Sequence, residues 1–131
     1  MQLWAGPLPD GDAGLDRFRD VYIDPIVVNG QSTELQVLVD RARMLQGALE
    51  GMRHELHDVV TAPGRRAFAF TISGRHTGTL TSPLGEVAAT GRDVAFTGLD
   101  IFTVDETTSQ VTAIWAVADW LGLLLLAGAL G

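Results

Sequence analysis

The hydrophobic pattern of this chain changes its period near residue 52, and this change limits the possible folds. Residues 35–49 keep the 3.6-residue spacing of an amphipathic helix, whose other face is charged. Thr33 and Gln36 stand at capping-box spacing before this helix, and Gly51 supplies a stop after it. From residue 52 onward the period is two, which is typical of strands. We therefore expect one long helix to lie on a sheet, with its charged side in water.

Extended segments are expected at 52–60, 67–73, 94–104 and from residue 111, the first two joined by a Pro63-Gly64 turn. Before the long helix, a short helix carrying Leu15, Phe18 and Tyr22 should end at Pro25, and a short strand should follow at 26–28. Helices first and strands afterwards predict an α+β fold, with helices on one face of a curved antiparallel sheet.

Composition excludes several classes of protein. The 131 residues predict a single domain over 1–131, with enough apolar content for an ordered core. A net charge of −7 with no lysine argues against nucleic-acid binding, which needs clustered basic residues. Without cysteine there is no disulfide or thiolate site, and the N-terminal residues lack a basic, then apolar, leader. We expect a cytoplasmic protein.

Residues 111–131 form the most apolar stretch, and Asp119 is the one charge within it. If the stretch begins as a strand, Trp115, Val117 and Asp119 share one side, while Ile114, Ala116 and Ala118 share the other. A carboxylate beside a tryptophan and a valine loses hydration, which raises its affinity for a proton. Asp119 is therefore a candidate general acid/base.

Two other interpretations of this stretch stay open. It approaches the length of a membrane anchor, but an aspartate at mid-span costs roughly 2.5–3.5 kcal/mol and no basic residue flanks it, so we expect no membrane span. Alternatively, Asp119 is the N-cap of a helix over residues 120–129, since aspartate is a favoured capping residue. Capping and catalysis are compatible.

Four short motifs, in the same order and with similar spacing, resemble those of the SnoaL-like polyketide cyclases over about residues 33–128. Gly74-Arg-His-Thr-Gly78 resembles the family's G-T-H-x-G turn, and Thr90-Gly-Arg92 resembles its P-T-G-R. Gly98-Leu-Asp-Ile-Phe102 resembles the next strand, and residues 115–124 resemble the closing W-x-x-x-D-x-L-G-L-L. The resemblance implies the cone-shaped fold of the nuclear transport factor 2-like superfamily, a curved antiparallel or mixed sheet with N-terminal helices packed on it.

The resemblance also implies a cofactor-free enzyme acting on a carbonyl-rich small molecule, with Asp119 aligned to the family's catalytic aspartate. Three departures are visible: a shortened first helix, Leu126 in place of a glutamine, and residues 105–110 in place of a D-G-k-I turn. They leave the substrate open. They also leave open whether the reaction is carbon–carbon closure, ether-ring formation, double-bond isomerisation or epoxide hydrolysis.

Asp119 and His76 are the predicted catalytic pair. In an aldol-type closure, one group removes a proton from carbon between carbonyls, and the other donates to the carbonyl that becomes an alkoxide. The alternative for His76 is a turn histidine that bonds local backbone. Asp100 is expected to orient His76 or a substrate hydroxyl, or else to make an ordinary buried hydrogen bond. The residues expected to shape the pocket are Trp115, Phe70, Phe96 and Phe102.

His54 is expected to form a second polar pair in the cavity with Asp58, which has the same strand parity. His57 falls on the opposite face from His54, so this spacing does not suit a shared metal, and no metal or other cofactor is expected. An epoxide hydrolase would need an extra acid where Val117 stands, which argues against the hydrolase alternative.

The sequence therefore predicts a cofactor-independent cyclase with an apolar pocket. The alternatives are an isomerase or epoxide hydrolase on the same fold, or a non-catalytic ligand-binding or dimerisation module. In that last case the run Leu123–Leu126 would be an interface. A homodimer is expected either way, because an apolar terminal segment on a small domain needs covering.

Overall fold

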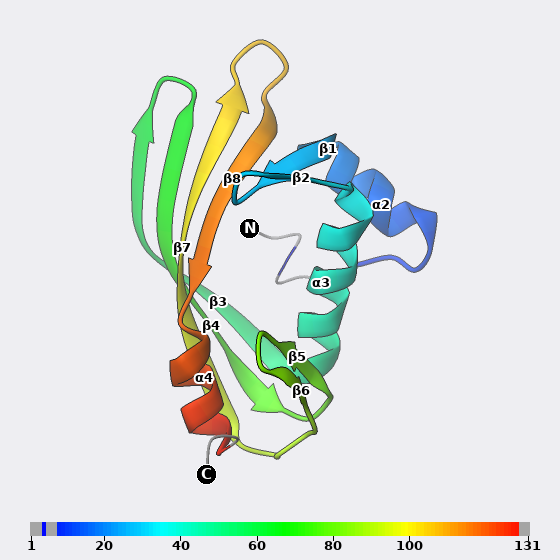
Figure 1. Ribbon diagram of the computed structural model, residues 1–131, viewed down its shortest axis with the longest axis vertical. Helices are drawn as coiled ribbons and strands as arrows, with labels where there is room; N and C mark the ends of the chain where they lie inside the picture. The colour runs from blue at the N-terminus through cyan, green and yellow to red at the C-terminus, as the bar shows by residue number, and fades with distance from the viewer. Residues whose placement is uncertain (1–3, 5–7, 129–131) are drawn as a thin grey trace.

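The computed structural model describes Trp4 and residues 8–128, which form helices on one side of a curved sheet (Figure 1). The helices are α2 (Asp12–Arg19), α3 (Leu35–Ala48) and α4 (Trp120–Ala127). The strands are β1 (Tyr22–Val28), β2 (Gln31–Thr33), β3 (Leu49–Ala62), β4 (Arg65–His76), β5 (Leu80–Ser82), β6 (Gly85–Val87), β7 (Asp93–Asp105) and β8 (Gln110–Ala118).

The main sheet has the order β2-β1-β8-β7-β4-β3, and β5 and β6 form a separate hairpin. All neighbours pair antiparallel except β1 and β8, which are parallel, so the sheet is mixed. The long helix α3 lies on the inner side of the curve, with the β5–β6 hairpin near its C-terminal end (Figure 1). The predicted α+β class and the helix on one face are confirmed.

Apolar side chains from α2, α3 and the sheet form two buried clusters. One includes Phe18, Ile26 and Leu35 together with Phe102 and Ile114. The other includes Leu45, Leu49 and Ile72 together with Leu80 and Leu123. The α3 pattern predicted from the sequence explains both, because its buried side chains belong to the first cluster at one end and to the second at the other.

The N-terminal part differs from prediction. The first helix ends at Arg19, and Tyr22 begins β1 instead of completing a helical stripe. Pro25 lies inside β1, after a cis peptide bond to Asp24. Thr33 is the last residue of β2 and does not cap α3; the Asp24 carboxylate instead accepts a hydrogen bond from the Leu35 N–H at 3.1 Å. A cap supplied from a neighbouring strand is invisible to a local motif search.

Strand β3 contains two irregularities that the alternating pattern did not predict. Gly51, with φ +62°, does not end the helix; it sits inside β3 where the register to β4 shifts. A second shift lies between Leu56 and Asp58. A bulge of this kind reverses which residues face the inner side. By contrast, β4 runs through Gly74 to His76 without a shift in its register to β7.

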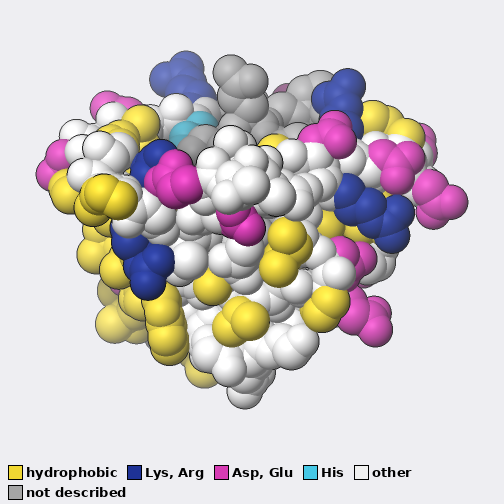
Figure 2. Space-filling view, turned by 90° about the horizontal axis from the view of Figure 1, so that it is seen from above, with side chains coloured by type: hydrophobic (Ala, Val, Ile, Leu, Met, Phe, Trp, Pro, Cys, Tyr) yellow, Lys and Arg dark blue, Asp and Glu magenta, His cyan; other side chains and the backbone are white. Residues whose placement is uncertain are grey.

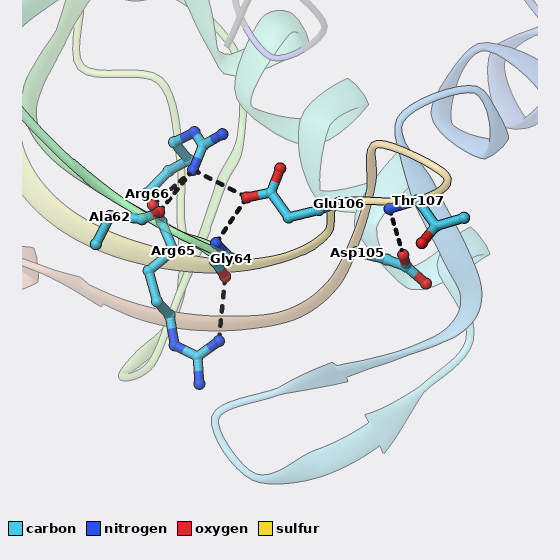
Figure 3. Close-up of polar contacts among 7 residues, drawn as sticks. All are labelled: Ala62, Gly64, Arg65, Arg66, Asp105, Glu106 and Thr107. Atoms are coloured by element: carbon cyan, nitrogen blue, oxygen red, sulfur yellow. Dashed lines mark hydrogen bonds and ion pairs between the residues drawn. The ribbon is translucent and has the colours of Figure 1, made fainter.

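The β3–β4 and β7–β8 turns are tied together at the far end of the sheet. The Glu106 carboxylate accepts the Gly64 N–H at 2.6 Å and lies 3.7 Å from the Arg66 guanidinium (Figure 3). Asp105 accepts the Thr107 N–H at 2.8 Å and so closes its own turn. The polar segment 105–110 therefore forms the predicted turn and also braces the neighbouring hairpin.

The last strand leads into α4, which the Asp119 side chain caps by accepting the Gly122 N–H at 2.9 Å. The capping alternative for Asp119 is confirmed. Leu123 and Leu124 are buried, whereas Leu121, Leu125 and Leu126 are exposed. Within the described residues, no helix is both long and apolar enough to cross a membrane.

Apolar side chains are also exposed on the outer side of the sheet. Seen from above, hydrophobic side chains gather along the left side of the molecule, where the sheet lies in Figure 1 (Figure 2). In the β7–β8 pairing, Leu99 stands opposite Val117 and Ile101 opposite Trp115. These four side chains, here called the outer patch, are 59%, 71%, 45% and 56% exposed, respectively.

Candidate active site

A cavity of about 690 Å³ lies between α3 and the inner face of the sheet, bordered by both buried clusters. A volume of this size is ordinary for a small-molecule site. Most of the lining is apolar. Its polar residues, within the described part of the chain, are Tyr22, Asn29, Asp40, Arg41, His54, Thr81, Ser82 and Asp100.

Asp100 is the acid on the inner face of the sheet. In the strand register it stands between Phe68 of β4 and Ala116 of β8, and Phe102 follows it on the same face. Its carboxylate makes no hydrogen bond or ion pair with the described residues, and burial raises its pKa to about 6. Asp100 can therefore gain and lose a proton near neutral pH.

Tyr22 is a second ionisable group on the same cavity. Its hydroxyl accepts a hydrogen bond from the Trp4 indole N–H at 3.2 Å. Burial is the main cause that raises the Tyr22 pKa; the Trp4 hydrogen bond lowers it, and the nearby Asp100 charge raises it further. Tyr22 thus stays protonated at neutral pH, and its hydroxyl and the Asp100 carboxylate are close enough to interact.

His54 enters the cavity from β3. Its ring stacks on Phe70, with the ring centroids 5.3 Å apart. Phe70 can lie across β7 because residue 98 is glycine, where a Cβ would collide with the ring. The His54 Nε2 atom is buried and has no hydrogen-bond partner in the described part of the chain, and burial lowers the pKa of the imidazole. A neutral ring with an unpaired nitrogen is suited to hydrogen-bond a ligand carbonyl or hydroxyl.

The structure brings together six of the residues that the sequence singled out. Five of them lie on the inner face, and Val117 reaches the lining from the rim while remaining mostly exposed. These six residues are His54, Phe70, Phe96, Asp100, Phe102 and Val117. The expected His54–Asp58 pair does not form on one face, because the bulge after Leu56 places Asp58 opposite Ala69, on the outer side.

Asp119, His76 and Trp115 lie outside this lining. Within β8 the predicted alternation is confirmed, with Ile114, Ala116 and Ala118 on the inner side and Trp115 and Val117 on the other. Asp119 follows the strand as the N-cap of α4. It is exposed, and the expectation that it is buried is wrong. Trp115 stands on the outer side, with its ring against Gly30.

His76 is fully buried at the other end of β4. Its Nδ1 lies 3.0 Å from the Thr90 hydroxyl oxygen, and its backbone N–H donates to the Arg92 carbonyl. The Nε2 atom has no partner among the described residues. The structure does not bring His76 and Asp119 into the cavity with Asp100.

Sequence reasoning missed most of the other lining residues, among them Tyr22, Asn29, Arg41 and Trp120. Asn29 continues the parallel pairing of β1 with β8 by its side chain. Its Oδ1 accepts the Ala116 N–H at 2.8 Å, and its Nδ2 donates to the Ala116 carbonyl at 3.2 Å. The Asn29-Gly30 dipeptide indicates a turn at this point of the sequence but does not predict the contact with Ala116.

Comparison with known proteins agrees with the geometry. The SnoaL-like polyketide cyclase family model matches residues 10–125. No sequence among the curated proteins matches the chain.

Solved structures of similar shape include AclR from Streptomyces galilaeus, for which a hydroxylase role has been suggested (19% identity, 90% of this chain and 86% of that one, TM-score 0.72). A protein from Jannaschia sp. CCS1, for which a SnoaL-like polyketide cyclase role has been suggested, is 14% identical over 98% of this chain and 85% of that one, with a TM-score of 0.74. IdmH from Streptomyces antibioticus, for which a polyketide cyclase role has been suggested, is 18% identical over 87% of this chain and 86% of that one, with a TM-score of 0.69.

The curved sheet, the helix on its inner side and the cavity between them define an α+β protein of the nuclear transport factor 2-like type. With the family model spanning residues 10–125, the chain belongs to the SnoaL-like polyketide cyclase family.

Proposed function

We propose that this protein is a cofactor-independent cyclase that closes a ring in a carbonyl-rich, polyketide-type small molecule, with Asp100 as the general acid/base. One observation carries the proposal: an acid without a hydrogen-bond partner in the described chain faces an apolar cavity inside a cyclase-family fold. A carboxylate whose pKa is near 6 is well matched to proton transfer at neutral pH.

The chemistry follows from the lining. Ionised Asp100 removes a proton from a carbon flanked by carbonyls, and the electron pair left on that carbon attacks a second carbonyl carbon. The oxygen of that carbonyl becomes an alkoxide, which a neutral donor such as His54 or Tyr22 can stabilise by hydrogen bonding. Closure through an enol oxygen would form a C–O bond with the same proton acceptor. The apolar walls hold the flexible substrate folded, which can supply several kcal/mol through orientation.

The catalytic pair predicted from the sequence, Asp119 with His76, is the competing assignment. Asp119 is exposed and its carboxylate already accepts the Gly122 N–H, while His76 is buried in the core beside Thr90. Both roles need a substrate atom that reaches these side chains. The cavity lining supports Asp100 over Asp119.

Turnover of the native substrate tests the proposal. The substrate is the intermediate that accumulates when the gene is deleted in its host, supplied to purified protein. Asp100→Asn keeps the side-chain shape and removes the proton acceptor, and we expect kcat to fall by about 10²- to 10⁴-fold. The matched control is Asp119→Asn, which should stay within about threefold of wild type. A normal rate in the first variant, with a large loss in the second, would transfer the role to Asp119.

We also propose that the protein is a homodimer and that the outer patch forms its interface. Two cross-strand pairs of large apolar side chains are exposed there side by side. Apolar area of this kind on a small domain favours association. A twofold axis through a sheet face would place each patch on its counterpart.

A further inference from the structure

Arg41 is the only Lys or Arg among the described residues that line the cavity. It belongs to a row on α3 with Val37 and Met44, spaced so that all three project to the same side of the helix. All three are lining residues. Arg41 is exposed, so the row marks the border between the apolar interior and solvent.

The Arg41 guanidinium makes no hydrogen bond or ion pair with the described residues. The neighbouring Asp40 also lines the cavity but makes no ion pair with Arg41; its carboxylate accepts the Gln36 amide N–H at 2.9 Å. Arg43, two residues further along α3, is engaged instead: its Nη2 donates to the Pro9 carbonyl at 2.7 Å and to the Gly11 carbonyl at 2.9 Å. The helix thus presents one free cation to the cavity, in a chain with a net charge of −7.

We infer that Arg41 binds a carboxylate of the ligand, so that the substrate is an acid with an apolar, carbonyl-bearing body. This deepens the proposed function and rests on the same cavity. A guanidinium presents a planar fork of N–H donors that matches the two oxygens of a carboxylate. A phosphate dianion fits less well: Arg41 lies in the middle of α3, away from its N-terminus, and no second Lys or Arg of the described residues lines the cavity.

This anchor orients the ligand. A carboxylate held at α3 fixes one end at the rim, and the rest of the molecule extends over the apolar lining toward the sheet, where Asp100 and His54 stand. The cation also keeps the negative end of the ligand away from Asp100, whose ionised form is needed as the base. Arg41 is therefore a binding residue that selects acids over their neutral esters and amides.

Binding of two aromatic probes tests the inference without turnover. The probes are anthracene-9-carboxylate and the neutral anthracene-9-carboxamide, titrated at pH 7 by calorimetry. Wild type should bind the carboxylate about tenfold more tightly than the amide. Arg41→Gln should lose that preference while its affinity for the amide stays unchanged, and Arg41→Lys should keep part of it. The control is Arg53→Gln, which removes the same charge from β3 at a position paired with Ser73, outside the cavity lining.

Equal binding of the two probes by wild type, binding of neither, or an unchanged preference in Arg41→Gln would overturn the inference. An aryl phosphate bound more tightly than the carboxylate would overturn the choice of carboxylate. Thermal unfolding of each variant confirms that it is folded, since Arg41 is exposed and holds no structural contact among the described residues. Because no catalysis is measured, a negative result leaves the Asp100 turnover experiment standing, and the reverse also holds.

Discussion

The two faces of the β7–β8 hairpin reverse the usual distribution of polar and apolar side chains. The inner face carries Asp100 next to Phe102, half-buried and without a hydrogen bond from the described residues. The outer face, one residue away along the same strand, carries Leu99 and Ile101 in the open. A buried polar group and an exposed apolar patch are the two departures from ordinary burial that carry information about function.

The difference is what the two proposals predict, since each assigns a different neighbour to each face. The inner face keeps an acid at a cost in hydration, which suits a group that must exchange a proton with a ligand. The outer face keeps apolar area exposed in this chain, which suits contact with a second copy. In an ordinary strand of a small domain, the charged side chain faces solvent and the apolar one faces the core. Asp100 and Leu99 of β7 do the reverse.

The largest expected effect is on association. Leu99→Glu places a carboxylate in each half of a twofold interface, and unpaired buried charges cost several kcal/mol each. We expect the dimer dissociation constant to rise by more than about 10³-fold. Sedimentation velocity over a concentration series measures it, with Leu84→Glu, exposed in the β5–β6 turn, as the control. A wild type that sediments as a monomer at all concentrations would remove the explanation for the outer patch.

The next largest expected effect is on the free energy of unfolding, for the adjacent residues Phe102 and Ile101 on opposite faces of β7. Phe102 is 8% exposed and Ile101 is 45% exposed. Phe102→Ala should lower the free energy of unfolding by about 3 kcal/mol, the lower end for a buried phenylalanine because it borders a cavity. Ile101→Ala should cost less than about 1 kcal/mol. Urea titrations in the Leu99→Glu background exclude the contribution of association, and equal costs would contradict the assigned strand parity.

Stability against pH isolates the acid on the inner face. Burial raises the Asp100 pKa from 3.8 to about 6. Between these values the native protein holds a proton that the unfolded chain has released. The free energy of unfolding therefore falls as pH rises through this window, and the cost is fully present above about pH 6.

Asp100→Asn removes this cost. We expect the variant to be more stable than wild type by about 1–2 kcal/mol at pH 7.5, a figure reduced for partial solvation, and the difference to vanish near pH 4. Denaturant titrations at several pH values measure it. A variant that is less stable than wild type at pH 7.5 would show that the carboxylate has a native partner. The same substitution would thus lose activity and gain stability.

Asp119 should respond in the opposite way and more weakly. Asp119→Ala removes the α4 cap and should lower the free energy of unfolding by about 1 kcal/mol, whereas Asp119→Asn should cost little because asparagine also caps helices. Thermal unfolding of the two variants measures the difference. Identical losses would mean that the charge, and not the cap, is what α4 requires.

Much of the fold was predictable because it rests on local patterns. The α3 stripe and the alternation of Phe96 with Phe102 identified elements and faces correctly. Alternation along β8 grouped Trp115 with Val117 correctly, but it could not say which side faces inward. Both sides of β8 are apolar, so hydrophobicity gives no preference, and only the pairing with β7 decides. The sequence alone therefore favours Asp119 as the acid facing the cavity and gives Asp100 only an orienting role.

The rest of the site depends on contacts between distant parts of the chain. Tyr22 joins the cavity because β1 pairs in parallel with the last strand, a partner some ninety residues later in the chain. Asp58 leaves it because one bulge shifts the register. Arg41 lies on the polar side of α3, where a residue bordering a cavity has the same sequence signature as one in bulk water. None of these placements has a signal within a short window of sequence.

Asn29 belongs to the turn after β1 and also extends the pairing of β1 with β8 by its side chain. By holding both backbone groups of Ala116, its amide substitutes for a strand residue at the point where the ladder of β1 ends. The strand that pairs with Asp100 is therefore held in place by a surface turn. Changes in the length or composition of that turn would alter the width of the cavity without changing any group proposed to take part in the reaction. Related chains could in this way come to accept molecules of different size.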